Sequence, residues 1–167
     1  ITIYMTGGIA DYKAVNVIRD LEKAGHQVRI VMTKNAEHFV TTNTLAALTK
    51  YPVLDDLWSK ENESSIPHVH LARWTELALV LPATANFIAK MATGIADDAA
   101  KLVVPAMNDQ MWNNPATQRN IAFLKEHGVE IMEPAVGMLA EGYAAKGRMP
   151  EPGAIVAWIK NFTEQQN

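Results

Sequence analysis

The fold is indicated first by the stretch Ile1-Thr2-Ile3-Tyr4-Met5-Thr6-Gly7-Gly8, in which β-branched residues lead directly into two glycines. This composition predicts a buried strand that ends in a tight turn. From Asp11 to Ala24 the apolar residues recur at intervals of three and four, and Gly25 follows where a helix C-cap is expected. We therefore expect a strand, a glycine turn and a helix, in that order.

The same alternation continues along the chain. Further strands are expected at 26–32, 77–81, 102–104 and 129–132, and further helices at about 36–48, 84–96, 115–127 and 152–162. Pro82 and Pro105 are expected to end their strands, and the polar residues 59–65 to form an exposed loop. The alternation predicts an α/β fold: a doubly wound, Rossmann-like or flavodoxin-like parallel sheet with helices on both faces. With 167 residues we expect a single domain, residues 1–167.

Composition limits the classes of function. Hydrophobic residues make up 49% of the chain and charged ones 20%, which is typical of a globular protein, and no apolar run is long enough for a membrane helix. A formal net charge of -3 provides no basic field for nucleic acid. The lack of cysteine excludes disulfides, thiolate metal sites and a thiol nucleophile. No basic-then-apolar signal segment is present, so we expect a cytoplasmic protein without membrane contact.

Small and hydroxyl residues follow several of the predicted strands, where ligands bind in doubly wound folds. For any one segment, helix capping or turn formation is the simpler explanation, but several segments converge at one sheet edge. Free N–H groups and the helix dipole at helix N-termini favour a phosphate there. Neither the P-loop nor the complete dinucleotide glycine motif is present, which disfavours ATP hydrolysis and a standard NAD site. The sequence thus predicts a phosphate-bearing cofactor near segments 6–10, 33–35, 82–86 and 105–108.

His68 and His70 are a second candidate site. Two imidazoles two residues apart on a strand would point the same way and could share a metal, but the spacing indicates no third ligand. Acid–base catalysis by a single histidine is therefore favoured over a metal site, with surface histidines in a loop as the alternative. The nearby cluster of Met107, Met111 and Trp112 predicts either ordinary packing or the wall of a flavin or substrate site.

Nearly the whole chain resembles the FMN-dependent cysteine decarboxylases. The most specific feature is the octapeptide from Pro105 to Trp112, which matches the family signature P-x-M-N-x-x-M-W. The segments 6–13 and 82–86 resemble the two flavin loops of the family, and 147–152 resembles the end of its substrate-covering flap. His68, shortly before Leu71-Ala72-Arg73-Trp74, falls at the position of the family's catalytic histidine.

The resemblance implies a role for each of these residues. His68 would be the acid–base residue, Asn108 would bind the substrate carboxylate through its amide, and Met111 would also contact the substrate. A flap around 135–152 would cover the substrate, and His70 has no family role, so no metal is expected. FMN would be held by Gly7, Gly8, Ile9, Thr33, Thr84, Ala85, Asn86, Phe87, Ala106 and Met107.

The resemblance also implies an activity. In this family the flavin oxidises a cysteinyl C–S unit to a thioaldehyde, which serves as the electron sink for loss of CO2. The motifs are nearest to the branch of coenzyme A biosynthesis, which implies decarboxylation of 4'-phosphopantothenoylcysteine, a small phosphorylated cysteinyl substrate, to 4'-phosphopantetheine. The family also implies a homotrimer or dodecamer with flavin near the subunit contacts.

One motif departs from the family pattern. The family's flap cysteine, which donates a proton in the reductive step, lies in a Leu-Ala-Cys-Gly run, whereas this chain reads Leu139-Ala140-Glu141-Gly142. The proton donor would then be Glu141 or absent; a carboxyl group in a closed apolar flap can carry a raised pKa and donate a proton. The alternatives are an oxidative decarboxylase that stops at the enethiol, or a catalytically silent flavin-binding regulatory subunit. Retention of His68 and Asn108 argues against the silent subunit.

Overall fold

The computed structural model describes residues 1–55, 67–94 and 100–165 and has a parallel sheet at its centre. The strands are β1 (Thr2–Met5), β2 (Arg29–Met32), β3 (Ala78–Ala83), β4 (Ala100–Pro105) and β5 (Glu130–Ile131). They lie in the order β2-β1-β3-β4-β5, and every neighbouring pair is parallel. The chain moves to one side of β1 to form β2 and to the other to form β3, so the switch point where such folds bind ligands lies beside β1.

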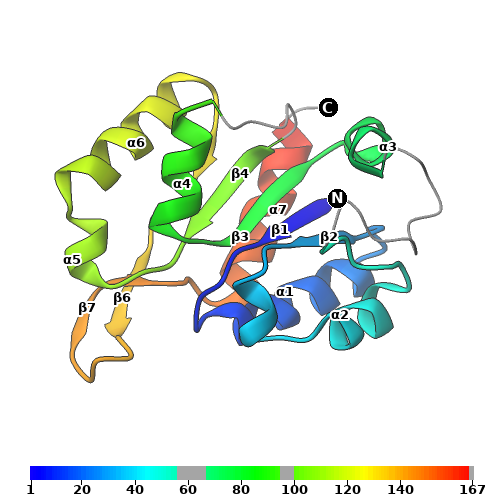
Figure 1. The fold of residues 1–167 in the computed structure, drawn as a ribbon, viewed down its shortest axis with the longest axis horizontal. Coiled ribbons are helices and arrows are strands. Elements are labelled where there is room, and N and C mark those ends of the chain that lie inside the picture. Colours follow the sequence, from blue (N-terminus) through cyan, green and yellow to red (C-terminus); the bar gives the residue numbers. More distant parts are fainter. Residues whose placement is uncertain (56–66, 95–99, 166–167) are drawn as a thin grey trace.

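Helices cover both faces of the sheet (Figure 1). One face packs against α1 (Asp11–Lys23), α2 (Thr42–Thr49) and α7 (Pro152–Gln165), and the other against α4 (Ala85–Ala92), α5 (Asp109–Trp112) and α6 (Pro115–Glu126). Strand alternation divides the core between them: Leu79 and Leu81 enter the first layer and Val80 the second. The predicted doubly wound α/β fold is confirmed.

Two features of the first half were predicted incorrectly. The helix expected at 36–48 is split into a short 3-10 helix, η1 (Ala36–His38), and α2, because Thr41 adopts an extended conformation and its hydroxyl caps α2 by accepting from Thr44 N at 3.3 Å. Pro82 does not stop β3 but lies within it, one residue before its end, whereas Pro105 is the last residue of β4, as predicted. The sheet tolerates the missing N–H of Pro82 because the β3–β4 register shifts between Val80 and Ala83.

The prediction for His68 and His70 was also wrong in its geometry. Both belong to a helix, α3 (Pro67–Trp74), and not to a strand, so the strand geometry considered for a shared metal does not apply. No cluster of three metal-binding side chains occurs in the part of the chain that the structure describes. The expected loop at 59–65 and the end of the helix expected at 84–96 lie outside the described residues.

A two-stranded antiparallel hairpin follows the sheet. It consists of β6 (Ala135–Met138) and β7 (Ala144–Arg148) and extends from the main body beside α5 (Figure 1). It occupies much of the segment for which the sequence predicts a flap. Within the described ranges, no helix has the length and apolar character needed to cross a membrane.

Candidate functional site

A cavity of ≈ 520 Å³ lies at the carboxyl ends of β1, β3 and β4. Four segments meet around it: the glycine turn with the start of α1, the start of α4, the stretch from Ala106 to Met111, and both strands of the hairpin. Most of the predicted site residues are brought together in its lining, namely Gly7, Gly8, Ile9, Thr84, Ala85, Ala106, Met107, Asn108, Met111 and Glu141. Thr33, Asn86 and Phe87 do not line it, and the side chain of His68 lies outside what the structure describes.

Gly7 brings two strand-end loops into contact. A Cβ atom at this position would lie 2.5 Å from Asn35 Cβ and 2.7 Å from the Asn35 carbonyl oxygen. Any side chain would therefore push the loop after β1 away from the loop after β2. At Gly8 nothing lies within 4 Å of an added Cβ, so this second glycine leaves open space at the cavity wall.

Thr6 joins the ends of β1 and β3; the sequence places it in the first predicted flavin loop but predicts no role for its side chain. Its buried hydroxyl donates to the Pro82 carbonyl oxygen at 2.7 Å and accepts from Thr84 N at 3.0 Å. These partners lie more than 70 residues away, so no local sequence signal identifies the contact. Thr84, the N-cap of α4, is therefore held next to the glycine turn.

Two polar side chains at the cavity cap helices. Thr84 Oγ1 accepts from Phe87 N at 3.2 Å at the start of α4, and Asn108 Oδ1 accepts from Gln110 N at 2.8 Å at the start of α5. In each case the capping oxygen is an acceptor, which leaves the hydroxyl proton of Thr84 and the N–H groups of Asn108 as donors.

Thr33, at the end of β2, carries a hydroxyl that is buried without a hydrogen-bond partner among the described residues. Buried polar atoms without partners are rare in folded proteins and call for an explanation such as a missing ligand. The unsatisfied hydroxyl would suit a polar ligand at the strand ends. Thr33 does not line the cavity, however, and its cofactor role stays a prediction.

Asp11, the first residue of α1, is a second unsatisfied group, which sequence reasoning missed. It is 0% exposed, and neither carboxylate oxygen has a partner in the residues that the structure covers. Burial raises the pKa of Asp11 to about 7, although the backbone of Gly8 opposes the shift. In the sequence it reads as an ordinary acidic residue at a helix N-terminus, because nothing local reveals that its side chain points inward.

The base of the hairpin is fixed to the sheet and to α1. Met107 N donates to the Gly147 carbonyl oxygen at 3.0 Å, and a Cβ at Gly147 would overlap the Met107 carbonyl oxygen.

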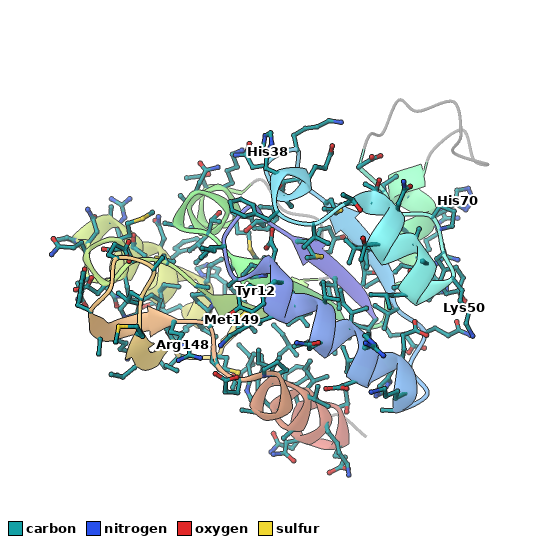
Figure 2. All side chains as sticks on the ribbon, turned by 90° about the horizontal axis from the view of Figure 1, so that it is seen from below. Tyr12, His38, Lys50, His70, Arg148 and Met149 are labelled. Carbon is teal, nitrogen blue, oxygen red and sulfur yellow. The ribbon has the colours of Figure 1, made fainter. Side chains whose placement is uncertain are left out.

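Ion pairs join the end of the hairpin to α1. Lys13 and Arg148 both bind Glu151 Oε1, at 2.9 and 2.8 Å, and the hydrogen bond from Lys13 lowers the pKa of Glu151. Figure 2 shows Arg148 and Met149 on the same side of the molecule as Tyr12, with His70 far from all three.

The tip of the hairpin is held by a different contact. Tyr143 Oη donates to Asp109 Oδ1 at 2.5 Å and accepts from Asn108 Nδ2 at 3.2 Å. Both partners lie in the octapeptide after β4. The hairpin is therefore tied to this octapeptide at its base through Gly147 and at its tip through Tyr143.

Comparisons with known proteins identify the family. A model described as Flavoprotein matches residues 1–164. This chain belongs to the flavoprotein family. The curated relatives of this flavoprotein include the coenzyme A biosynthesis bifunctional protein CoaBC of Vibrio vulnificus, 44% identical over 97% of the chain and 43% of the relative, and that of Bacillus subtilis, 41% identical over 99% and 43%. The chain thus spans less than half the length of these relatives.

Solved structures agree with the family. A PPC decarboxylase mutant complexed with pantothenoylaminoethenethiol is similar with a TM-score of 0.82 and 28% identity, covering 98% of this flavoprotein and 97% of that chain. The FMN binding protein AtHal3 gives 0.80 and 29% over 99% and 97%, and the FMN-dependent cysteine decarboxylase SpaF gives 0.76 and 29% over 93% and 92%. The resemblance drawn from the motifs is confirmed.

Proposed function

We propose that this flavoprotein binds FMN and decarboxylates 4'-phosphopantothenoylcysteine to 4'-phosphopantetheine, in coenzyme A biosynthesis. The observation that carries the proposal is the cavity in which the glycine turn, Thr84 and the Asn108–Met111 segment meet, in a chain related along its length to the CoaBC proteins. A step shared with these biosynthetic relatives fits a cytoplasmic location.

Donors without partners support the cofactor assignment. Thr33 and Thr84 would bind the phosphate, because each has a hydroxyl proton that no described acceptor takes, and the start of α4 adds the positive end of a helix dipole. Asn86 and Phe87 would contribute backbone of that first turn, while Gly7, Gly8, Ile9, Ala85, Ala106 and Met107 would surround the rest of the molecule. Bound FMN supplies an electron acceptor for decarboxylation, which no side chain can provide.

Residues on the opposite wall would bind and protonate the substrate. Asn108 would donate an N–H to its carboxylate, and Met111 would cover its apolar part. His68 would move the proton at the thiol. The hairpin, as part of a flap around 135–152, would exclude water, and Glu141 at its tip would protonate the carbon after CO2 has left.

Apolar side chains around the cavity support a homo-oligomer. Ile9 is 65% exposed, Tyr12 62% and Met138 61%, and all three line the cavity. Large exposed apolar groups beside a site favour coverage by another molecule. We propose that a second copy of the chain covers them, in a homotrimer or dodecamer with flavin near the subunit contacts.

One assay tests the activity. The purified protein is incubated with 4'-phosphopantothenoylcysteine, and CO2 and the thiol product are followed by mass spectrometry. Saturated 4'-phosphopantetheine is expected. A product lighter by two hydrogens would instead identify an oxidative decarboxylase, a candidate favoured by Glu141 in place of the family's cysteine and by the structural likeness to SpaF. FMN binding without turnover would identify a silent regulatory subunit.

His68→Asn separates the chemical role of the histidine from cofactor binding. The variant is expected to release no CO2 while it keeps the yellow flavin, since an amide cannot exchange a proton near neutral pH. Turnover at the wild-type rate would rule out His68 as the acid–base residue.

A further inference from the structure

Tyr143 connects the tip of the hairpin to the residue that would bind the substrate carboxylate. Its phenol lies between two neighbouring side chains, donating to Asp109 and accepting from Asn108, which are 34 and 35 residues earlier in the chain. The hairpin turn holds Tyr143 in place, because Leu139 N donates to the Tyr143 carbonyl oxygen at 2.9 Å. The contact is thus between two segments that are each ordered by their own backbone bonds.

The hydrogen bonds of Asn108 fix the direction of its amide. The carbonyl oxygen is used by Gln110 N at 2.8 Å, so the amide nitrogen must face away from α5. One of its two N–H groups reaches Tyr143, and the second has no acceptor in the described parts of the chain. Asn108 also lines the cavity, where this second N–H can meet a ligand oxygen.

Asp109 sets the direction of the phenol. A carboxylate can only accept, so the single proton of Tyr143 points to Asp109 and a lone pair is left for the N–H of Asn108. A donor bound to a charged acceptor becomes a stronger acceptor itself. The hydrogen bond to Asp109 also raises the pKa of Tyr143, so the phenol keeps its proton and the chain of donors keeps its direction.

We infer that Tyr143 is a positioning residue for the decarboxylation, which orients the Asn108 amide toward the substrate carboxylate while it holds the hairpin tip against α5. The inference rests on the proposed function, since it deepens the role of Asn108 there. The contact also links the two walls of the site. Glu141 lies in the same turn as Tyr143, so the contact that orients Asn108 also positions Glu141, the proposed proton donor.

The test uses Tyr143→Phe in the flavin-loaded protein. KM for 4'-phosphopantothenoylcysteine is expected to rise roughly three- to tenfold, the effect of one hydrogen bond, with a smaller change in kcat and unchanged flavin content. Tyr51→Phe is the matched control. Its ring lies near Trp74 and Arg29, none of the three lines the cavity, and KM should stay at the wild-type value.

Hydrogen–deuterium exchange gives a second measurement that needs no turnover. In Tyr143→Phe, amides at 109–112 and 139–143 are expected to exchange faster, Gln110 above all, because its N–H is bound by the Asn108 side chain. Faster exchange with an unchanged KM would overturn the positioning role. If the wild-type protein fails to release CO2, the proposed function is wrong and the positioning role of Tyr143 is wrong with it. If the wild-type protein is active but exchange is unchanged in Tyr143→Phe, the Tyr143 inference alone is overturned.

Discussion

Single residues at the strand ends combine close packing with unsatisfied polarity. Gly7 is in contact with the next loop through its backbone alone, while Thr33 and Asp11 are buried with polar atoms that no described residue satisfies. Such an arrangement costs stability in the free protein. The cost is explained if the same atoms bind a ligand, because proteins commonly leave polar groups unsatisfied at functional sites.

Gly7→Ala is expected to destabilise the flavin-free protein by about 1–3 kcal/mol, because the added methyl group meets the backbone of Asn35. Urea unfolding measures the change. Gly8→Ala is the matched control, since its Cβ would enter open space and its free energy of unfolding should stay close to that of the wild type. Equal destabilisation by both substitutions would contradict the packing argument.

Asp11 makes the free energy of unfolding depend on pH in a defined direction. Its pKa is about 7 in the folded chain and near the ordinary value of 3.8 when unfolded, so between these values the folded state binds more protons and stability falls as pH rises. Above pH 7 the free energy of unfolding has fallen by its full amount, on the order of 2 kcal/mol once solvent screening of the carboxylate is taken into account.

The corresponding variant is Asp11→Asn, which removes this ionisation. The free energy of unfolding of the flavin-free variant is expected to exceed that of the wild type by more at pH 8.5 than at pH 5, as measured by urea unfolding. Asp20→Asn removes a partly exposed carboxylate from the same helix and serves as the control, with the wild-type pH dependence. A pH dependence identical in all three proteins would exclude the buried carboxyl as its cause.

Among the elements, α4 has the most direct connection between local structure and ligand binding. Its cap, Thr84, is bound to Thr6 through its backbone N–H, lines the cavity, and has a hydroxyl proton with no acceptor among the described residues. Thr84→Ala is therefore expected to cost about 1 kcal/mol of stability and to weaken FMN binding, whereas Thr84→Ser keeps the hydroxyl and should retain both. Denaturant unfolding and flavin fluorescence titration measure the two effects, and wild-type flavin affinity in the alanine variant would remove Thr84 from the phosphate site.

The elements also show what could be predicted from the sequence. Strands β1 and β3 and helix α1 were predicted because a β-branched run, a continuous apolar run and a three-to-four periodicity, respectively, are local signals. The hairpin strands were not, since β6 and β7 are rich in glycine and alanine and have no such pattern. The candidate site shows the same division: Asn108 and Thr84 stand in recognisable motifs, but Thr6, Asp11 and Tyr143 depend on distant contacts or inward orientation, which only the fold determines.

For the whole molecule, cofactor binding should appear as a gain in thermal stability. A ligand that binds the folded state alone raises Tm as its concentration increases. FMN is expected to raise Tm well above the effect of riboflavin at the same concentration, because riboflavin lacks the phosphate that Thr33 and Thr84 would bind. Differential scanning calorimetry of the flavin-free full chain tests this, and equal shifts would mean that the phosphate contributes little.

The attachment of Gly147 to Met107 has a practical consequence for protein engineering. Because a bond at 3.0 Å and the lack of room for a side chain fix this point, the rest of the hairpin can change without disturbing the sheet. The loop from 138 to 146 can therefore be exchanged in engineering, provided that the contact of Tyr143 with Asn108 and Asp109 is kept. Grafting the equivalent loop of another family member onto this base, with Tyr143 retained, is expected to change which compounds the proposed enzyme accepts while the glycine turn and the start of α4 stay as they are.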